Sequence, residues 1–83
     1  MQRIYQSFER QTMMQTLGAQ LGEVRAGYVE IIAPILPGSL QQHGYAHAAL
    51  IFAIGDSAAG YAALSVMGEE FEVLTAEMKI NLL

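Results

Sequence analysis

The 83-residue sequence is long enough for one domain, and its net charge of −4 and lack of cysteine exclude several classes of protein. Only four residues are basic, so no positive stripe can neutralise a row of phosphates, and we expect no nucleic-acid partner. His43 and His47 have no acidic neighbours at metal-ligand spacing, so we expect no metal site. Hydrophobic residues make up 53% of a chain too short to bury them all, which predicts a partner subunit.

The first segment, residues 3–17, predicts one amphipathic helix. Its apolar residues stand at mostly helical spacing among polar ones, and Gly18 follows where a left-handed C-terminal cap would lie. The N-terminus lacks the apolar core and small residues of a secretory signal, so a cytoplasmic location is the default expectation.

The next segment predicts a β-hairpin. Its arms are residues 20–25 and 28–33, and Ala26-Gly27 separates them with a glycine that can take a positive φ. Pro34 and the run Pro37-Gly38-Ser39 then interrupt regular structure.

A long apolar segment, Gly44 to Val66, predicts a helix enclosed on all sides, because it is apolar on nearly every face and rich in Ala and Gly. A membrane span is the alternative, since about 22 residues would suffice. Asp56 at the middle of the segment would cost about 2.5 to 3.5 kcal/mol in lipid. The small side chains also suit close approach of a sheet, so we expect no membrane partner.

The last segment, residues 70–82, alternates with period two and predicts a third strand with one buried face. The residues expected on that face are Leu74, Ala76, Met78, Ile80 and Leu82. Three strands are few to wrap a helix about 33 Å long at 1.5 Å per residue. The sequence therefore predicts an α+β fold that this chain leaves incomplete.

Four runs of residues, taken together, indicate a known family. They are Leu17-Gly18-Ala19, Gln41-Gln42-His43-Gly44-Tyr45-Ala46-His47-Ala48-Ala49, Asp56-Ser57-Ala58-Ala59-Gly60 and Leu74-Thr75-Ala76-Glu77-Met78-Lys79-Ile80-Asn81. The most specific part is an amide-bearing loop with a Gly-x-x-His tetrad and an aspartate nine residues after the histidine. With these motifs the chain resembles the PaaI-like hot-dog-fold thioesterases over nearly its whole length.

The resemblance implies a central helix wrapped by an antiparallel sheet, and hydrolysis of acyl-CoA thioesters by a homodimer or a dimer of dimers. It implies no cofactor, since coenzyme A enters as part of the substrate. It further implies that residues 1–83 form a single partial domain, either truncated after the third strand or completed by another copy.

The resemblance also assigns roles to residues. Asp56 would be the general base or nucleophile, Gln41 or Gln42 would orient the attacking water, and Thr75 would assist that water. The backbone N–H groups near Ala48 and Ala49 would bind the oxygen that gains negative charge, and the residues expected to contact substrate are His47, Ala49 and Gly60. Where the family usually has His-Gly-Gly, this chain has His47-Ala48-Ala49. The added methyl groups would crowd the acyl carbonyl but leave the N–H groups in place.

Helix geometry adds a constraint that does not depend on the family. Ala48 and Asp56 are eight residues apart, so about 12 Å separates them along one helix. Both would have to lie within about 3 to 4 Å of one carbonyl group. Two antiparallel helices across a two-fold axis would bring the start of one beside the middle of the other, which predicts a composite site at a dimer interface.

Each assignment has a structural alternative. Asp56 could be an acid held in a structural network, and His47 a satisfied helix-start residue. Gln41 and Gln42 could simply cap the helix, and Thr75 is an ordinary strand residue. The corresponding alternative for the whole chain is a catalytically inactive hot-dog fragment that acts only in self-association.

Overall fold

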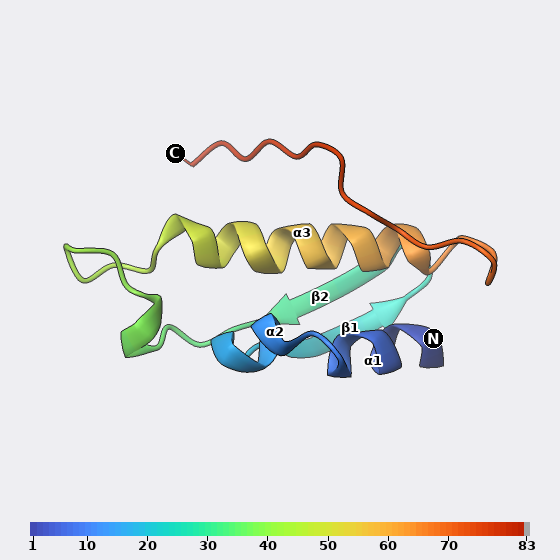
Figure 1. The fold of residues 1–83 in the computed structure, drawn as a ribbon, viewed down its shortest axis with the longest axis horizontal. Helices are drawn as coiled ribbons and strands as arrows, with labels where there is room; N and C mark the ends of the chain where they lie inside the picture. The colour runs from blue at the N-terminus through green and yellow to red at the C-terminus, as the bar shows by residue number, and fades with distance from the viewer. Residues whose placement is uncertain (83) are drawn as a thin grey trace.

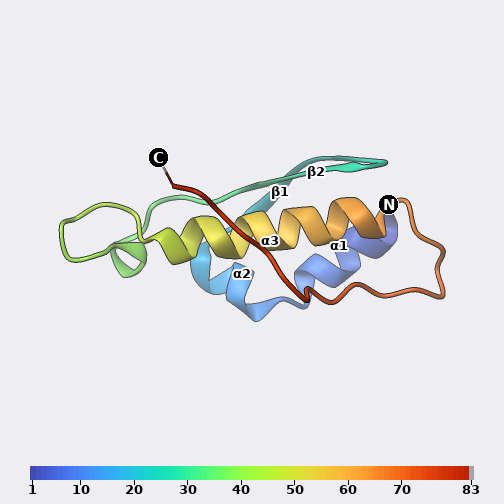
Figure 2. The ribbon, with the colours of Figure 1, turned by 90° about the horizontal axis from the view of Figure 1, so that it is seen from above.

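The computed structural model describes residues 1–82, and it shows an α+β arrangement around one central helix, as predicted (Figure 1). In chain order the elements are α1 (Gln2–Glu9), α2 (Thr12–Leu17), β1 (Gln20–Arg25), β2 (Tyr28–Ile32), the 3₁₀ helix η1 (Pro37–Ser39) and α3 (Ala48–Leu64). Seen from above, α1 and α2 flank one side of α3 and the hairpin flanks the other (Figure 2). We call residues 68–82 the C-terminal segment.

The N-terminal region forms two helices, so the prediction of one helix over residues 3–17 is wrong. The break lies at Gln11, whose backbone is extended with φ −81° and ψ 98°. There the Gln11 side chain turns towards α3 and donates a hydrogen bond to the Tyr61 hydroxyl at 2.7 Å. A polar contact with α3 thus accompanies the interruption of the helix. Gly18 ends α2 in the left-handed conformation, with φ 68°, as predicted.

The predicted hairpin is confirmed. Strands β1 and β2 pair antiparallel, and Gly27 occupies the turn with φ 76°. A bulge between Leu21 and Val24 shifts the register of the pair. The turn is attached to the end of α3, because the Gly27 N–H donates to the Ser65 hydroxyl at 2.7 Å. The hairpin and α3 therefore form one packed unit.

Helix α3 is shorter than predicted, since it begins at Ala48 rather than Gly44 and ends at Leu64. The residues before it form a closed loop in which Leu40 and Ala46 make an isolated antiparallel bridge. His47 then caps the helix in an extended conformation, with φ −67° and ψ 140°. Bridge and cap fix the start of α3 after the loop.

The prediction that α3 is enclosed on every side is wrong for the described chain. Leu50, Tyr61 and Leu64 are buried, whereas Ile51 and Phe52 remain 46% and 43% exposed. The hairpin and α1 cover the end of the helix near Leu64, while the exposed residues lie near its start. No helix in the described part of the chain is both long enough and apolar enough to cross a bilayer.

The C-terminal segment forms no strand over residues 70–82, contrary to the prediction. A strand needs a neighbour for its backbone hydrogen bonds, and the sheet of residues 1–82 contains only β1 and β2. The expected inward face is also partly wrong. Leu74 is 90% exposed and Leu82 is exposed, whereas Met78 and Ile80 are half-buried. A bend at Ala76 interrupts the extended run and with it the strict alternation.

Candidate functional site

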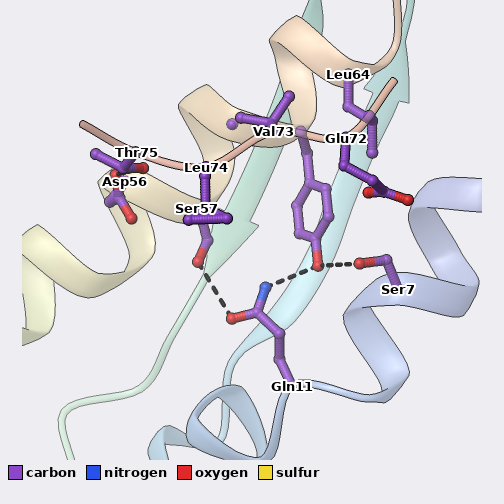
Figure 3. Close-up of a pocket in the computed structure, with 11 residues that line it drawn as sticks. Ser7, Gln11, Asp56, Ser57, Leu64, Glu72, Val73, Leu74 and Thr75 are labelled. Atoms are coloured by element: carbon purple, nitrogen blue, oxygen red, sulfur yellow. Dashed lines mark hydrogen bonds between the residues drawn. The ribbon is translucent and has the colours of Figure 1, made fainter. Parts of the chain in front are cut away.

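The C-terminal segment runs antiparallel to α3 and brings Thr75 beside Asp56. The Thr75 hydroxyl donates a hydrogen bond to Asp56 Oδ1 at 2.6 Å. Figure 3 shows the two side chains next to each other. Asp56 is half-buried on α3, as the resemblance requires, and Thr75 lies in the extended segment rather than in a strand. Among the described residues nothing hydrogen-bonds the second carboxylate oxygen.

Packing and one arginine hold the C-terminal segment against α3. Val73 joins the hydrophobic core and lies next to Gly60, where an added Cβ would stand 3.7 Å from its methyl group. Arg3 donates to the carbonyl oxygens of Gly68, at 3.0 Å, and of Phe71. It also faces Glu72 at 3.8 Å. The contacts of Arg3 and the packing of Val73 therefore both hold the residues just before Thr75 in place.

Asp56, Thr75 and Gly60 line a cleft with a volume of about 390 Å³ between α3, the N-terminal helices and the C-terminal segment. The predicted substrate contact Gly60 thus lies in the same cleft as the predicted base. Glu72 also lines the cleft and adds a second carboxylate.

The floor of this cleft is a polar network that the sequence analysis missed. Tyr61 is 6% exposed, and its hydroxyl lies 3.0 Å from the Ser7 hydroxyl and accepts from Gln11 Nε2 at 2.7 Å. Gln11 Oε1 in turn accepts from the Ser57 hydroxyl at 3.4 Å. Figure 3 shows Ser7, on α1, and Gln11, between α1 and α2, reaching towards α3.

A signal for this network does exist in the sequence. Ser57 and Tyr61 are four residues apart and share one face of a mainly apolar helix. Ser7 and Gln11 are also four residues apart, on the amphipathic N-terminal segment. The equal spacing of the two polar pairs is compatible with hydrogen bonds between the N-terminal region and α3. To predict those bonds, one must also know that the N-terminal helices pack against α3, and the spacing does not show this.

The start of α3 gathers a second group of predicted residues. The His47 ring nitrogen Nδ1 accepts from the Ala49 N–H at 2.9 Å, and the Leu50 N–H donates to the His47 carbonyl at 3.0 Å. Two of the first amides are therefore already satisfied. Within residues 1–82 the Ala48 N–H has no hydrogen-bond partner.

The predicted amides Gln41 and Gln42 lie in the loop before α3. Gln41 Oε1 accepts from the backbone N–H groups of His43, at 2.6 Å, and Tyr45, at 3.1 Å. Its carbonyl oxygen therefore shapes the loop, while its amide nitrogen remains available as a donor. Gln42 is exposed in the same loop.

Within one chain the two groups of residues line different cavities. Gln41, His47 and Ala48 line a cavity of about 530 Å³ at the helix start, away from the cleft of Asp56 and Thr75. Ala49 lines a third, mainly apolar cavity of about 410 Å³ together with Phe52 and Ile80. A single chain thus separates the candidate base from the candidate oxyanion donors. Their meeting across two chains stays a prediction.

Residues 1–82 contain no group of three or more His, Cys, Asp or Glu that could hold a metal ion.

The chain is similar to a protein of known structure. No protein-family model matches the chain, and no curated protein matches it either. A thioesterase family protein from Silicibacter pomeroyi has the same fold, with a TM-score of 0.95 and 46% sequence identity. The match covers 99% of this chain and 60% of that chain. The chain therefore spans about three fifths of the length of the protein it matches.

Proposed function

Because the chain belongs to the thioesterase family, we propose that it hydrolyses acyl-CoA thioesters at a site shared by two copies of the chain. Its fold is a hot-dog fold, of which residues 1–82 show the central helix and two strands. The observation that carries the proposal is the carboxylate of Asp56, which lines the cleft and accepts a hydrogen bond from Thr75 through Oδ1.

In the proposed reaction Asp56 acts as a general base. Its free oxygen takes a proton from a water molecule, and the water oxygen bonds to the thioester carbon. The carbonyl oxygen gains negative charge in the tetrahedral intermediate. Cleavage of the carbon–sulfur bond then releases a carboxylic acid, and the proton on Asp56 passes to the sulfur of coenzyme A. Direct attack by the same carboxylate oxygen is the nucleophilic variant of this route.

The hydrogen bonds at the start of α3 narrow the choice of oxyanion donor. The N–H groups of Ala49 and Leu50 already donate hydrogen bonds to His47. We therefore assign the role to the Ala48 N–H of the second copy, supported by the positive end of the helix dipole. The available Gln41 amide nitrogen, or Gln42, would orient the water, and His47 and Ala49 would contact the substrate near its carbonyl group.

Thr75 receives a different role from the one the resemblance implies. Since its hydroxyl donates to Asp56, it is a positioning residue that holds the carboxylate in one orientation. The remaining parts of the proposal are a PaaI-like homodimer or dimer of dimers, a cytoplasmic location, and no cofactor beyond the coenzyme A of the substrate.

Mixing two inactive variants tests the shared site. Asp56→Asn removes the base, and Ala48→Pro removes the N–H donor. Proline is well tolerated at the first helical position, and the extended conformation of His47 suits a following proline. In a mixed dimer, the intact Asp56 of one chain would meet the intact Ala48 N–H of the other. Random pairing makes half of the dimers mixed, each with one intact site, so we expect about a quarter of the wild-type rate.

The measurement is release of free thiol from an acyl-CoA, with each variant alone and with the refolded mixture. A mixture no more active than its components would contradict the shared site. Wild-type protein that forms dimers but releases no thiol would instead favour the alternative function, self-association without catalysis. The exposed apolar residues Ile51 and Phe52 near the helix start are the observation in favour of that second candidate.

A further inference from the structure

Arg3, near the start of the chain, contacts the C-terminal segment that carries Thr75, although it does not line the Asp56 cleft. On the basis of the proposed function, we infer that Arg3 is a positioning residue for hydrolysis. It acts through the C-terminal segment and keeps the Thr75 hydroxyl within reach of Asp56. Its hydrogen bonds join α1 to residues 65 and 68 positions later in the sequence.

The guanidinium group of Arg3 binds two backbone carbonyl groups at once. Nη1 donates to the Gly68 carbonyl oxygen at 3.0 Å, and Nη2 donates to that of Phe71. The Phe71 N–H also donates to the Gly68 carbonyl oxygen, at 3.1 Å, which closes a four-residue turn. Arg3 thus bonds both ends of the turn that begins the C-terminal segment. Lysine has a single compact ammonium group and lacks the fixed fork that spans two acceptors.

Arg3 extends from a helix that is itself fixed to α3. The next residue, Ile4, is 1% exposed in the core, and the hydroxyl of Ser7, one turn further along α1, lies 3.0 Å from that of Tyr61. The N-terminus and the chain that leaves α3 lie at the same end of the molecule (Figures 1 and 2). The turn is therefore held against a well-packed part of the molecule.

Few other contacts fix the chain around Thr75. Phe71 precedes it by four residues, and the run between them pairs with no strand of residues 1–82. Two nonpolar side chains, Val73 and Met78, lie next to glycines of α3 on either side of Thr75. Nonpolar contacts have no fixed direction, so they resist sliding along a helix less than hydrogen bonds do. Loss of the Arg3 contacts should therefore let Thr75 shift away from its acceptor.

The hydrogen bond that Arg3 supports sets an upper limit to its effect. Loss of the Thr75 hydroxyl should lower kcat by about five- to tenfold, the effect of one hydrogen bond. A loosened segment would still form that bond part of the time, so Arg3→Met should lower kcat by only about two- to fivefold, with KM little changed. Once Thr75→Val has removed the bond, Arg3→Met should have no further effect on kcat.

A double-mutant cycle tests this dependence. Thiol release from an acyl-CoA gives kcat and KM for the oligomeric wild type, Arg3→Met, Thr75→Val and the double variant. Arg3→Lys keeps the charge but not the fork, and it should recover only part of the rate. Arg10→Met removes the same group from an exposed position at the end of α1 and should keep the wild-type kcat. Thermal unfolding confirms that each variant is folded, and Arg3→Lys serves if Arg3→Met is not.

NMR of the Thr75 methyl group tests the inference apart from catalysis. The three-bond couplings of this methyl carbon to the backbone show whether χ1 keeps one rotamer or averages over several. We expect one rotamer in the wild type and in Arg10→Met, and averaged couplings in Arg3→Met. A loss of overall stability that left the segment in place would not change these couplings.

Three results would overturn the inference: unchanged Thr75 couplings in Arg3→Met, a loss of kcat equally large with and without the Thr75 hydroxyl, or a raised KM at unchanged kcat. The last result would mean that Arg3 contacts the substrate. Failure of the proposed function has a different signature, because the wild type itself would then release no thiol. In that case averaged couplings in Arg3→Met would still support the positioning of Thr75 by Arg3, and only its link to hydrolysis would be rejected.

Discussion

The two halves of α3 differ in how the chain surrounds them. The half that ends at Leu64 carries the buried Tyr61, packs against α1 and the hairpin, and holds Asp56 near the middle of the helix. The half that begins at Ala48 leaves Ile51 and Phe52 exposed and borders open cavities. One copy of the chain thus builds the cleft of the proposed base but leaves the proposed oxyanion donor on an uncovered surface. Under the proposed function, the second copy would therefore contact the open half of α3 rather than the packed half.

The largest effect should follow from removing the proposed base, which lies near the middle of α3 and lines the cleft beside its packed half. Asp56→Asn keeps the size of the side chain but removes its ability to take a proton. We expect thiol release to fall by about 10² to 10⁴-fold, the usual contribution of a general base, with the fold retained. Steady-state rates and circular dichroism measure the two parts of this prediction. Glu77→Gln, at an exposed position of the C-terminal segment, is the matched control. Equal rates for the two variants would reject Asp56 as the base.

Truncating one aromatic residue in each half of α3 should show how much each half contributes to stability. Tyr61→Ala removes a buried ring from the core and should lower the free energy of unfolding by about 3 to 5 kcal/mol. Phe52→Ala removes a ring that is 43% exposed, and in the isolated chain it should cost well under half as much. Chemical denaturation at low protein concentration measures both. If Phe52→Ala proves as costly as Tyr61→Ala, a partner already covers the open half under those conditions.

The sequence predicts local elements well where neighbouring residues determine them. The turn at Gly27 and the cap at Gly18 need a positive φ, which glycine supplies locally, so the hairpin and the end of α2 were predicted correctly. The alternating residues 70–82 show why other predictions failed. The alternation shows that the segment could form a strand with one apolar face. A strand also needs another strand to pair with, and within residues 1–82 this segment has no such partner.

In the candidate site, too, the sequence predicted what depends on neighbouring residues and missed what depends on contacts between distant segments. The motif spacing brought Asp56 and Thr75 to attention, and the structure places them in hydrogen-bond contact. It could not show that Thr75 contacts the carboxylate, because that depends on how the C-terminal segment runs past α3. The Tyr61 network was missed for the same reason. Its partners Ser7 and Gln11 are more than 45 residues away in sequence, and they meet Tyr61 only through packing of the N-terminal helices.

A smaller effect is expected from the residue that positions Asp56. Thr75→Val keeps the shape of the side chain but removes the hydroxyl that donates to Asp56 Oδ1. Loss of one hydrogen bond should lower kcat by about five- to tenfold. Because the bond orients the base and not the substrate, we expect KM to change little. Thr75→Ser retains the hydroxyl and should restore most of the rate. An increase in KM at unchanged kcat would show instead that Thr75 contacts the substrate.

The smallest expected effect concerns the cap of the open half. His47 Nδ1 accepts the Ala49 N–H, so His47→Ala should lower the free energy of unfolding by about 0.5 to 1 kcal/mol. His47→Asn offers another acceptor at the same position and should recover most of this loss. His43→Ala, in the exposed loop, is the matched control and should leave the unfolding midpoint unchanged. Because packing contributes little around Ala48, a cap that proves worthless would mean that the start of α3 is held by something outside residues 1–82. The second copy of the proposed function is the first candidate. If that copy contacts Phe52, Phe52→Asp should weaken the contact, and His47→Ala should then lower the free energy of unfolding in the Phe52→Asp background.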